Sequence, residues 1–158
     1  MIFVTTGTQF SFDRLLLLVQ KWAEVNKDVK VVAQTCSSNT HFKFMETKDF
    51  LNPSEYNLLV SSATVIVGHA GMGTIITAHE FNLPVIIMPR RLAFNEHRND
   101  HQMATVSKFR GTKGIHIAED EQTLFTLLDK SNQLEACGNS IPHSRAALTQ
   151  YLSEQINL

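Results

Sequence analysis

Residues 64–89, TVIVGHAGMGTIITAHEFNLPVIIMP, decide the fold because they hold a strand, a turn, a helix and a second strand in order. The apolar run at 64–68 predicts a buried strand, and the run at 84–89 predicts another. The segment between them, 72–82, is expected to be a helix. Near-continuous apolar strands that alternate with helices are typical of a parallel sheet with helices on both faces. The sequence therefore predicts an α/β, Rossmann-like fold.

The same alternation runs through the rest of the chain, with no repeat or low-complexity linker. Further strands are expected at 2–6, 29–35, 42–45 (the weakest) and 114–118, and further helices at 12–25, 53–62, 96–109 and 120–130. A last amphipathic helix is expected over about 143–156, with one apolar face formed by Leu148, Tyr151, Leu152 and Ile156. We expect one domain over residues 1–158.

Composition excludes several classes of protein. The chain has 158 residues, 43% of them hydrophobic and 18% charged, which is typical of a globular protein and not of a disordered one. A formal net charge of −1 offers no basic excess for a nucleic-acid backbone. The two cysteines, Cys36 and Cys137, form no CxxC pair and indicate a reducing, cytoplasmic location. No signal peptide is recognised, and the apolar run at 15–19 is far too short to span a membrane.

The turn GHAGMGT, residues 68–74, predicts an anion site at the start of a helix. Free N–H groups of a first helical turn and the helix dipole both favour a negative ligand there. Glycines let the backbone approach a phosphate closely, and Thr74 and His69 add polar groups that could bind or charge-balance a diphosphate. The alternative is that the glycines only permit tight strand-to-helix packing. The turn matches neither GxGxxG nor a P-loop, so a standard dinucleotide or ATP site is not expected.

Two longer stretches carry a resemblance to a known family. VTTGTQFSFDRLL at 4–16 and VGHAGMGTIITAHEFNLPVIIMPRRLAFNEHRNDHQ at 67–102 resemble the C-terminal, donor-binding domain of glycosyltransferase family 28. The nearest subgroup is the short single-domain subunits of bacterial exopolysaccharide synthesis. These are similar to the catalytic subunit of the eukaryotic two-part enzyme that adds the second GlcNAc to a dolichol-linked glycan. The resemblance implies a UDP-sugar site on the C-terminal half of a GT-B enzyme.

The resemblance also implies roles for individual residues. Gly7 and Thr8 match the loop that faces the donor phosphates, and Leu51 matches the position whose backbone meets the uracil. The polar pair that contacts the donor sugar corresponds to Asp100 and Gln102. The diphosphate loop corresponds to His69, Gly71, Met72, Gly73 and Thr74. Among these residues, His69 and Asp100 are the candidates for a catalytic role.

The sequence departs from the family pattern at two positions. The ribose-binding glutamate of the family falls on Thr77 here, and Glu80 could substitute because positions three apart share a helix face. The family's glycine in the following turn is replaced by Asn82, which tolerates a left-handed backbone better than most residues. Ribose recognition is thus left open between Thr77 and Glu80.

The resemblance implies an inverting, metal-independent hexosyltransferase that moves a hexose or HexNAc from a UDP-sugar to a lipid-linked acceptor. No cofactor is implied. The chain offers no residues for an acceptor-binding domain, so a membrane-anchored partner subunit is expected to supply one and to hold this chain at the inner face of the membrane. The alternative is a non-catalytic UDP-sugar-binding or regulatory module. A nucleotide-sugar epimerase would be expected to need a second domain.

Three further features have open interpretations. His97 and His101 have the spacing of zinc ligands but no third ligand in register, so they are expected to be solvated or close to the sugar. Arg90 and Arg91 could pair with a diphosphate or acidic lipid, or could be solvated. Leu17 and Leu18 lie outside the main apolar stripe of the first helix, which indicates a helix buried between layers or a partner surface.

Overall fold

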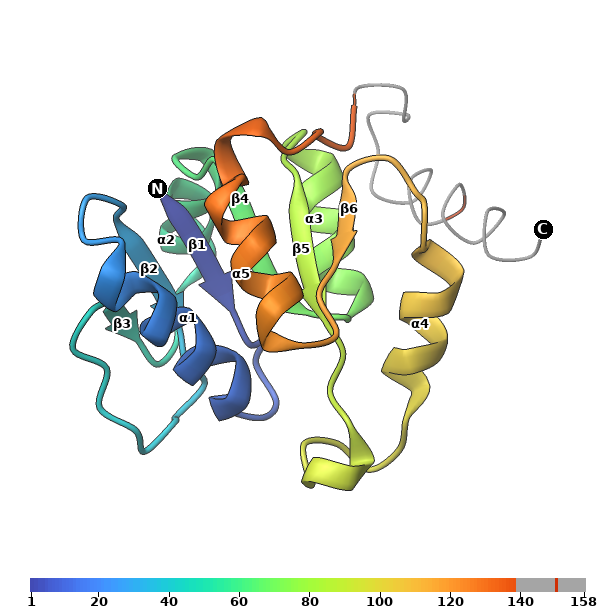
Figure 1. The fold of residues 1–158 in the computed structure, drawn as a ribbon, viewed down its shortest axis with the longest axis horizontal. Helices are drawn as coiled ribbons and strands as arrows, with labels where there is room; N and C mark the ends of the chain where they lie inside the picture. The colour runs from blue at the N-terminus through green and yellow to red at the C-terminus, as the bar shows by residue number, and fades with distance from the viewer. Residues whose placement is uncertain (139–149, 151–158) are drawn as a thin grey trace.

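The computed structural model describes residues 1–138 and Gln150, and its centre is one parallel sheet (Figure 1). The six strands are ordered β3-β2-β1-β4-β5-β6. Their bounds are β1 Ile2–Thr5, β2 Val31–Gln34, β3 Glu46–Lys48, β4 Val65–His69, β5 Val85–Met88 and β6 Ile115–Ile117. The order reverses between β1 and β4, and in open α/β sheets a ligand crevice forms at such a point, outside the carboxyl ends of the strands.

Helices cover both faces of the sheet (Figure 1). Their bounds are α1 Asp13–Val25, α2 Pro53–Ser61, α3 Met72–Glu80, α4 His101–Phe109 and α5 Glu121–Asp129, with 3-10 turns η1 Leu92–Phe94 and η2 Ser131–Gln133. Helices α1 and α5 share one core cluster with alternate strand residues such as Val4 and Val67. Helices α2, α3 and α4 share the other cluster with Phe3 and Ile66. The alternation of side chains along each central strand explains why these strands are apolar throughout.

Strand register brings polar groups together at one edge of the sheet. Thr5 pairs with Gln34 of β2 and with Gly68 of β4, so the carboxyl ends of three strands lie at the same level. The hydroxyl of Thr5 donates to Oε1 of Gln34 at 3.1 Å. The hydroxyl of Thr6 donates to the carbonyl oxygen of Gln34 at 3.2 Å. The start of the β1–α1 loop is therefore fixed to the end of β2.

Two expected elements are wrong in their bounds. Residues 42–45 contain no strand: Phe42 and Met45 are buried loop residues, and the strand follows them at Glu46–Lys48. This edge strand is held by backbone pairing with β2, and its exposed polar side chains give no apolar signal. The helix expected over 96–109 begins only at His101. The other bounds agree within two residues, apart from the helix expected over about 143–156, which lies outside the described residues.

Helix α1 is covered on one side only. Leu18 is partly buried against the core cluster of α1 and α5, whereas Leu17 is 46% exposed. The expectation of a helix buried between layers is therefore wrong for Leu17. Within the part of the chain that the structure describes, no helix is long and apolar enough to cross a membrane.

Candidate functional site

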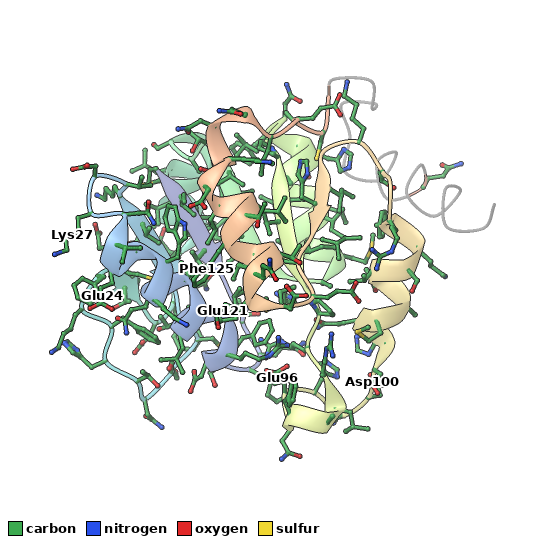
Figure 2. All side chains as sticks on the ribbon, in the orientation of Figure 1. Glu24, Lys27, Glu96, Asp100, Glu121 and Phe125 are labelled. Atoms are coloured by element: carbon green, nitrogen blue, oxygen red, sulfur yellow. The ribbon has the colours of Figure 1, made fainter. Side chains whose placement is uncertain are left out.

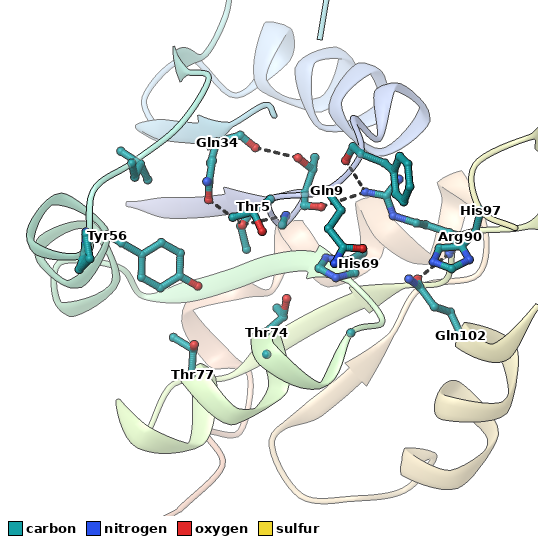
Figure 3. A pocket seen from close by; sticks show the side chains of 18 of the residues that line it. Thr5, Gln9, Gln34, Tyr56, His69, Thr74, Thr77, Arg90, His97 and Gln102 are labelled. Carbon is teal, nitrogen blue, oxygen red and sulfur yellow. Dashed lines mark hydrogen bonds between the residues drawn. The ribbon is translucent and has the colours of Figure 1, made fainter. Parts of the chain in front are cut away.

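A pocket of about 640 Å³ opens at the carboxyl ends of the central strands, where the strand order reverses. It lies between the β1–α1 loop, the start of α3, the start of α2 and the loop before α4 (Figure 3). Of the residues expected from the sequence, the lining includes Gly7, Thr8, Leu51, His69, Gly71, Gly73, Thr74, Thr77, Glu80 and Gln102. Residues that are far apart in the sequence thus meet in one cavity. Met72 and Asp100 are not part of its lining.

The amino end of α3 faces this pocket without a side-chain cap. Gly71 is the N-cap residue in an extended conformation, and no side chain accepts from the first turn of the helix. The lining includes Gly71, Gly73 and Thr74 from this end of the helix. Because the first N–H groups of a helix have no partner within the helix, they are available to an anionic ligand, which the helix dipole also favours.

The ring of His69 lies between two glycines. A Cβ at Gly7 would come within 2.9 Å of Cε1 of His69, and a Cβ at Gly71 would overlap Nε2 and Cδ2 of the same ring. Gly7 also has a φ of +81°, which an L-residue rarely adopts. The first loop and the α3 loop therefore approach each other with the imidazole between them.

Burial, and after it the positive charge of Arg90, lowers the pKa of His69 to about 4. The ring is thus neutral near pH 7 in the ligand-free protein. The suggestion that His69 balances the charge of a diphosphate as a cation is not supported for this state. Nδ1 is buried and none of the described residues forms a hydrogen bond with it, so only the part of the ring that lines the pocket is available to a ligand.

The structure explains the glycines of the 68–74 turn in different ways. A Cβ at Gly68 would meet the carbonyl oxygen of Thr5 and the methyl group of Thr74, both at 2.9 Å, so this glycine serves strand-to-helix packing. A Cβ at Gly73 would meet nothing within 4 Å, and its φ is not in the left-handed region. Packing therefore accounts for Gly68 but leaves Gly73 unexplained. Close approach of a ligand would explain it.

A second part of the pocket lies between α2 and α3. Leu51, Pro53 and Asn57 line it from the α2 side, together with Tyr56, whose ring points toward α3 (Figure 3). The Tyr56 ring packs edge-on against Phe3 at 5.4 Å between centroids. The start of α2 is fixed by a capping box in which Asn52 accepts from the Glu55 N–H and Glu55 accepts from the Asn52 N–H.

Thr77 and Glu80 line this same part of the pocket from α3. Thr77 is 9% exposed, whereas Glu80 is exposed. The positions of Thr77 and Glu80 therefore allow either residue to contact a ribose in the pocket. Asn82 has a φ of 50°, which confirms that the turn after this helix needs a left-handed residue.

The polar pair expected to contact the sugar is split by the structure. Gln102 is 4% exposed, lines the pocket and accepts from the backbone N–H of Arg90 at 3.0 Å. Because Oε1 is engaged, the amide presents its N–H donors to the cavity. Asp100 is exposed at the start of α4, and its carboxylate accepts from the Leu92 N–H at 2.8 Å (Figure 2). In this structure Asp100 holds its own loop.

Three aromatic side chains lie at the pocket mouth. Phe10 packs edge-on against His97 at 6.1 Å between centroids, and His97 packs edge-on against His101 at 4.5 Å. All three line the pocket, which places both histidines where a bound sugar could reach them. Burial, and after it the nearby charges of His101 and Arg90, lowers the pKa of His97. Among the described residues, no group of three or more His, Cys, Asp or Glu side chains could hold a metal ion.

Arg90 is a buried residue of the site, not a solvated one. It is 2% exposed and lines the pocket. Its guanidinium donates to backbone carbonyl oxygens of the first loop. Arg91 is half-buried, and its guanidinium donates to the carbonyl oxygen of Glu119 at 3.3 Å. The sequence showed only that two arginines follow a strand.

Several lining residues are absent from the sequence prediction, among them Thr5, Thr6, Gln9, Gln34 and Tyr56. Gln34 carried a usable signal, since it is a polar residue at the carboxyl end of an apolar strand. Tyr56 carried none, because an aromatic residue in a short helix is most often part of the core.

The class of protein follows from the strand order and the pocket. A parallel sheet ordered 3-2-1-4-5-6 with its ligand crevice at the reversal point defines a Rossmann-like domain. The fold is that of the C-terminal half of GT-B glycosyltransferases. Residues 1–149 match the family described as glycosyltransferase family 28 C-terminal domain, and the chain belongs to that family.

Solved structures agree with this fold. The solution structure of ALG13 is similar over 99% of this chain and 96% of its own, with a TM-score of 0.67 and 16% identity. UDP-GlcNAc 2-epimerase from Neisseria meningitidis, bound to UDP-GlcNAc, matches with a TM-score of 0.60 and 10% identity over 99% of this chain and 43% of its own.

Os79 from O. sativa, in complex with UDP, matches with a TM-score of 0.57 and 13% identity over 98% of this chain and 36% of its own. This chain thus spans well under half the length of the latter two proteins. The sequence matches no curated protein.

Proposed function

We propose that the chain binds a UDP-sugar and is the donor-binding subunit of a glycosyltransferase. One observation carries the proposal: the pocket at the strand-order reversal opens onto the uncapped amino end of α3, and His69 lines it in close contact with Gly7 and Gly71. A diphosphate fits the electrostatics of this end of the helix. The UDP ligand of Os79 and the UDP-GlcNAc ligand of the epimerase, both on related folds, support the choice of nucleotide.

The positions of the residues assign parts of the ligand. The diphosphate would lie at Gly73 and Thr74, within reach of Thr8 and His69. The uridine would extend toward Leu51 and Tyr56, with its ribose near Thr77 or Glu80. The sugar would extend toward Gln102.

The chemistry proposed is a single displacement with inversion. A hydroxyl of a lipid-linked acceptor attacks the anomeric carbon of a hexose or HexNAc, the bond from that carbon to the diphosphate oxygen breaks, and UDP leaves. The charge that develops on UDP is stabilised by the α3 N–H groups and by Thr74, with no metal and no cofactor. The base that accepts the hydroxyl proton belongs to a membrane-anchored partner subunit, which holds this chain at the cytoplasmic face of the membrane.

Thermal unfolding tests nucleotide binding. UDP should raise the melting temperature while ADP and GDP do not. The shift should be easy to measure, because a ligand at a hundredfold excess over Kd contributes about 2.7 kcal/mol to the free energy of unfolding. Thr74→Val should reduce the UDP shift. The matched control is Thr126→Val on the exposed face of α5, where the hydroxyl donates only to the Gln122 carbonyl oxygen at 2.8 Å. Equal shifts with all three nucleotides would contradict the uridine assignment.

Sugar transfer tests the need for a partner. The purified chain should bind UDP yet transfer no sugar to a lipid acceptor until the partner subunit is added. Truncation after Pro142 should abolish this rescue while leaving UDP binding largely intact. Robust transfer by the chain alone would contradict the two-subunit proposal. Binding without transfer in the presence of the partner would favour the non-catalytic, regulatory alternative.

A further inference from the structure

The buried guanidinium of Arg90 joins two loops that border the pocket (Figure 3). Nη2 donates to the carbonyl oxygens of Thr6 at 2.9 Å and Phe10 at 2.7 Å. Nη1 donates to the carbonyl oxygens of Ser11 at 2.6 Å and Glu96 at 3.4 Å. Three of these acceptors belong to the β1–α1 loop and the fourth belongs to the loop between β5 and α4. One side chain thus fixes both loops relative to β5.

Further contacts hold the same two loops. Arg90 stacks over the ring of Phe12 at 4.6 Å. Arg14, in the first turn of α1, pairs with the Glu96 carboxylate through Nε at 2.6 Å and Nη2 at 2.9 Å. Nη2 of Arg14 also donates to the carbonyl oxygen of Pro89 at 2.8 Å. The Glu96 carboxylate in addition accepts from the Arg91 N–H at 2.9 Å.

These bonds leave the guanidinium of Arg90 little capacity for a ligand. Both terminal nitrogens already donate to backbone carbonyl oxygens, and breaking those bonds would leave buried acceptors unpaired. A direct ion pair with a diphosphate would require that loss. Arg90 is thus placed to act on the shape of the pocket through the loop that it holds.

We propose that Arg90 is a positioning residue, whose guanidinium holds the β1–α1 loop in the conformation that puts Gly7 and Thr8 against His69. Its backbone N–H has a parallel effect, because it fixes Oε1 of Gln102 at 3.0 Å and so turns the amide donors toward the cavity. The consequence for donor affinity rests on the proposed function. The effect on the loop itself does not.

Geometry requires arginine here and not only a positive charge. The acceptor oxygens come from three residues of one loop and one residue of another, and the two terminal nitrogens of a planar guanidinium, each with two N–H groups, reach all of them. A lysine ammonium carries its three donors on a single nitrogen atom, so it cannot span the same set. Arg90→Lys therefore removes the set of hydrogen bonds to the two loops while it keeps the positive charge.

The experiment compares Arg90→Lys and Arg90→Met with Arg110→Met. Arg110 is exposed at the carboxyl end of α4 and pairs with Glu119 at 2.8 Å, and among the described residues its side chain bonds to neither loop, so it controls for loss of an arginine. Backbone order parameters of residues 8–11 are measured by NMR in the ligand-free full chain, followed by the Kd for UDP. A pH titration of His69 in the lysine variant reports whether the first loop still buries the ring, because burial is the main cause of its low pKa.

We expect Arg90→Lys to fold, to lower the order parameters of residues 8–11, and to raise the pKa of His69 because the first loop no longer buries the ring. UDP affinity should fall about tenfold or more, the range for losing hydrogen bonds to a charged group. If Arg90→Met does not fold, the lysine variant alone decides. Arg110→Met should change neither quantity.

Three results would overturn the proposal. Unchanged order parameters in Arg90→Lys would show that the loop does not depend on the guanidinium fork. A loosened loop with unchanged UDP affinity would show that the loop conformation does not serve binding. Equal effects in Arg110→Met would show a non-specific response. Failure of the wild-type chain to bind UDP would instead contradict the proposed function. The ligand-free measurement would still test whether Arg90 holds the β1–α1 loop.

Discussion

Gly73→Ala is expected to make the protein more stable and the donor site worse. Gly73 lies in the first turn of α3, where glycine costs stability relative to alanine, and a Cβ there would meet nothing within 4 Å. Its φ is not in the left-handed region, so alanine adds no backbone strain. The free energy of unfolding should therefore rise by about 0.5–1 kcal/mol. For a chain of this size this corresponds to roughly 1–4 °C in melting temperature.

The same methyl group would point into the space that we assign to the diphosphate. Steric overlap with a closely packed ligand costs about 1–3 kcal/mol, or roughly 5- to 150-fold in Kd. Urea unfolding measures the first effect, and calorimetric titration with UDP measures the second. Gly111→Ala is the matched control: Gly111 has a φ of +81° and open space around its Cβ, so alanine there should destabilise the protein without changing the Kd. A stabilised Gly73→Ala variant that binds UDP as well as the wild type would refute close approach of the diphosphate.

Three further outcomes are expected. Because the pKa of His69 is lowered to about 4 in the folded protein, its contribution to stability should be complete above its ordinary pKa of 6.5 and lost as the pH falls toward 4. Urea unfolding of His69→Gln should show a smaller loss of stability over this pH range than the wild type. Equal losses in the two proteins would contradict the assignment. If Glu80 binds the ribose, Glu80→Ala should weaken UDP binding by about 1–3 kcal/mol, whereas an effect of Thr77→Val alone would move the role to Thr77. Gln102→Leu should weaken binding of the UDP-sugar more than Asp100→Leu, and the reverse order, measured by titration, would restore Asp100 as the sugar contact.

The sequence alone was sufficient for the fold class. Strands β1, β4 and β5 are buried on both faces, so their residues must be apolar throughout, and that pattern is visible without a structure. The glycine-rich turn after β4 likewise predicted the amino end of α3 as a ligand site. Edge strand β3 gave no such signal, because it is held by backbone pairing and its side chains are exposed.

The loop before α4 shows where sequence patterns stop being sufficient. A helix was expected from residue 96, but Asn95 has a φ of 55° and ends η1, and the Glu96 carboxylate is bound by Arg14 of α1. Arg14 lies 82 residues from Glu96 in the sequence, so no local preference reports this pair. Tertiary contacts, not helix propensity, set the start of α4.

Sequence by itself determined that this is an α/β chain with a glycine-rich loop after its fourth strand, because burial and backbone freedom each restrict which residue types are possible. Only the tertiary structure decided that Gln102 faces the cavity while Asp100 holds its own loop. It also decided that Arg90 is buried and bonded to two loops. The acceptors of Arg90 are backbone carbonyl oxygens, which every residue possesses, and so no residue type in the sequence marks them.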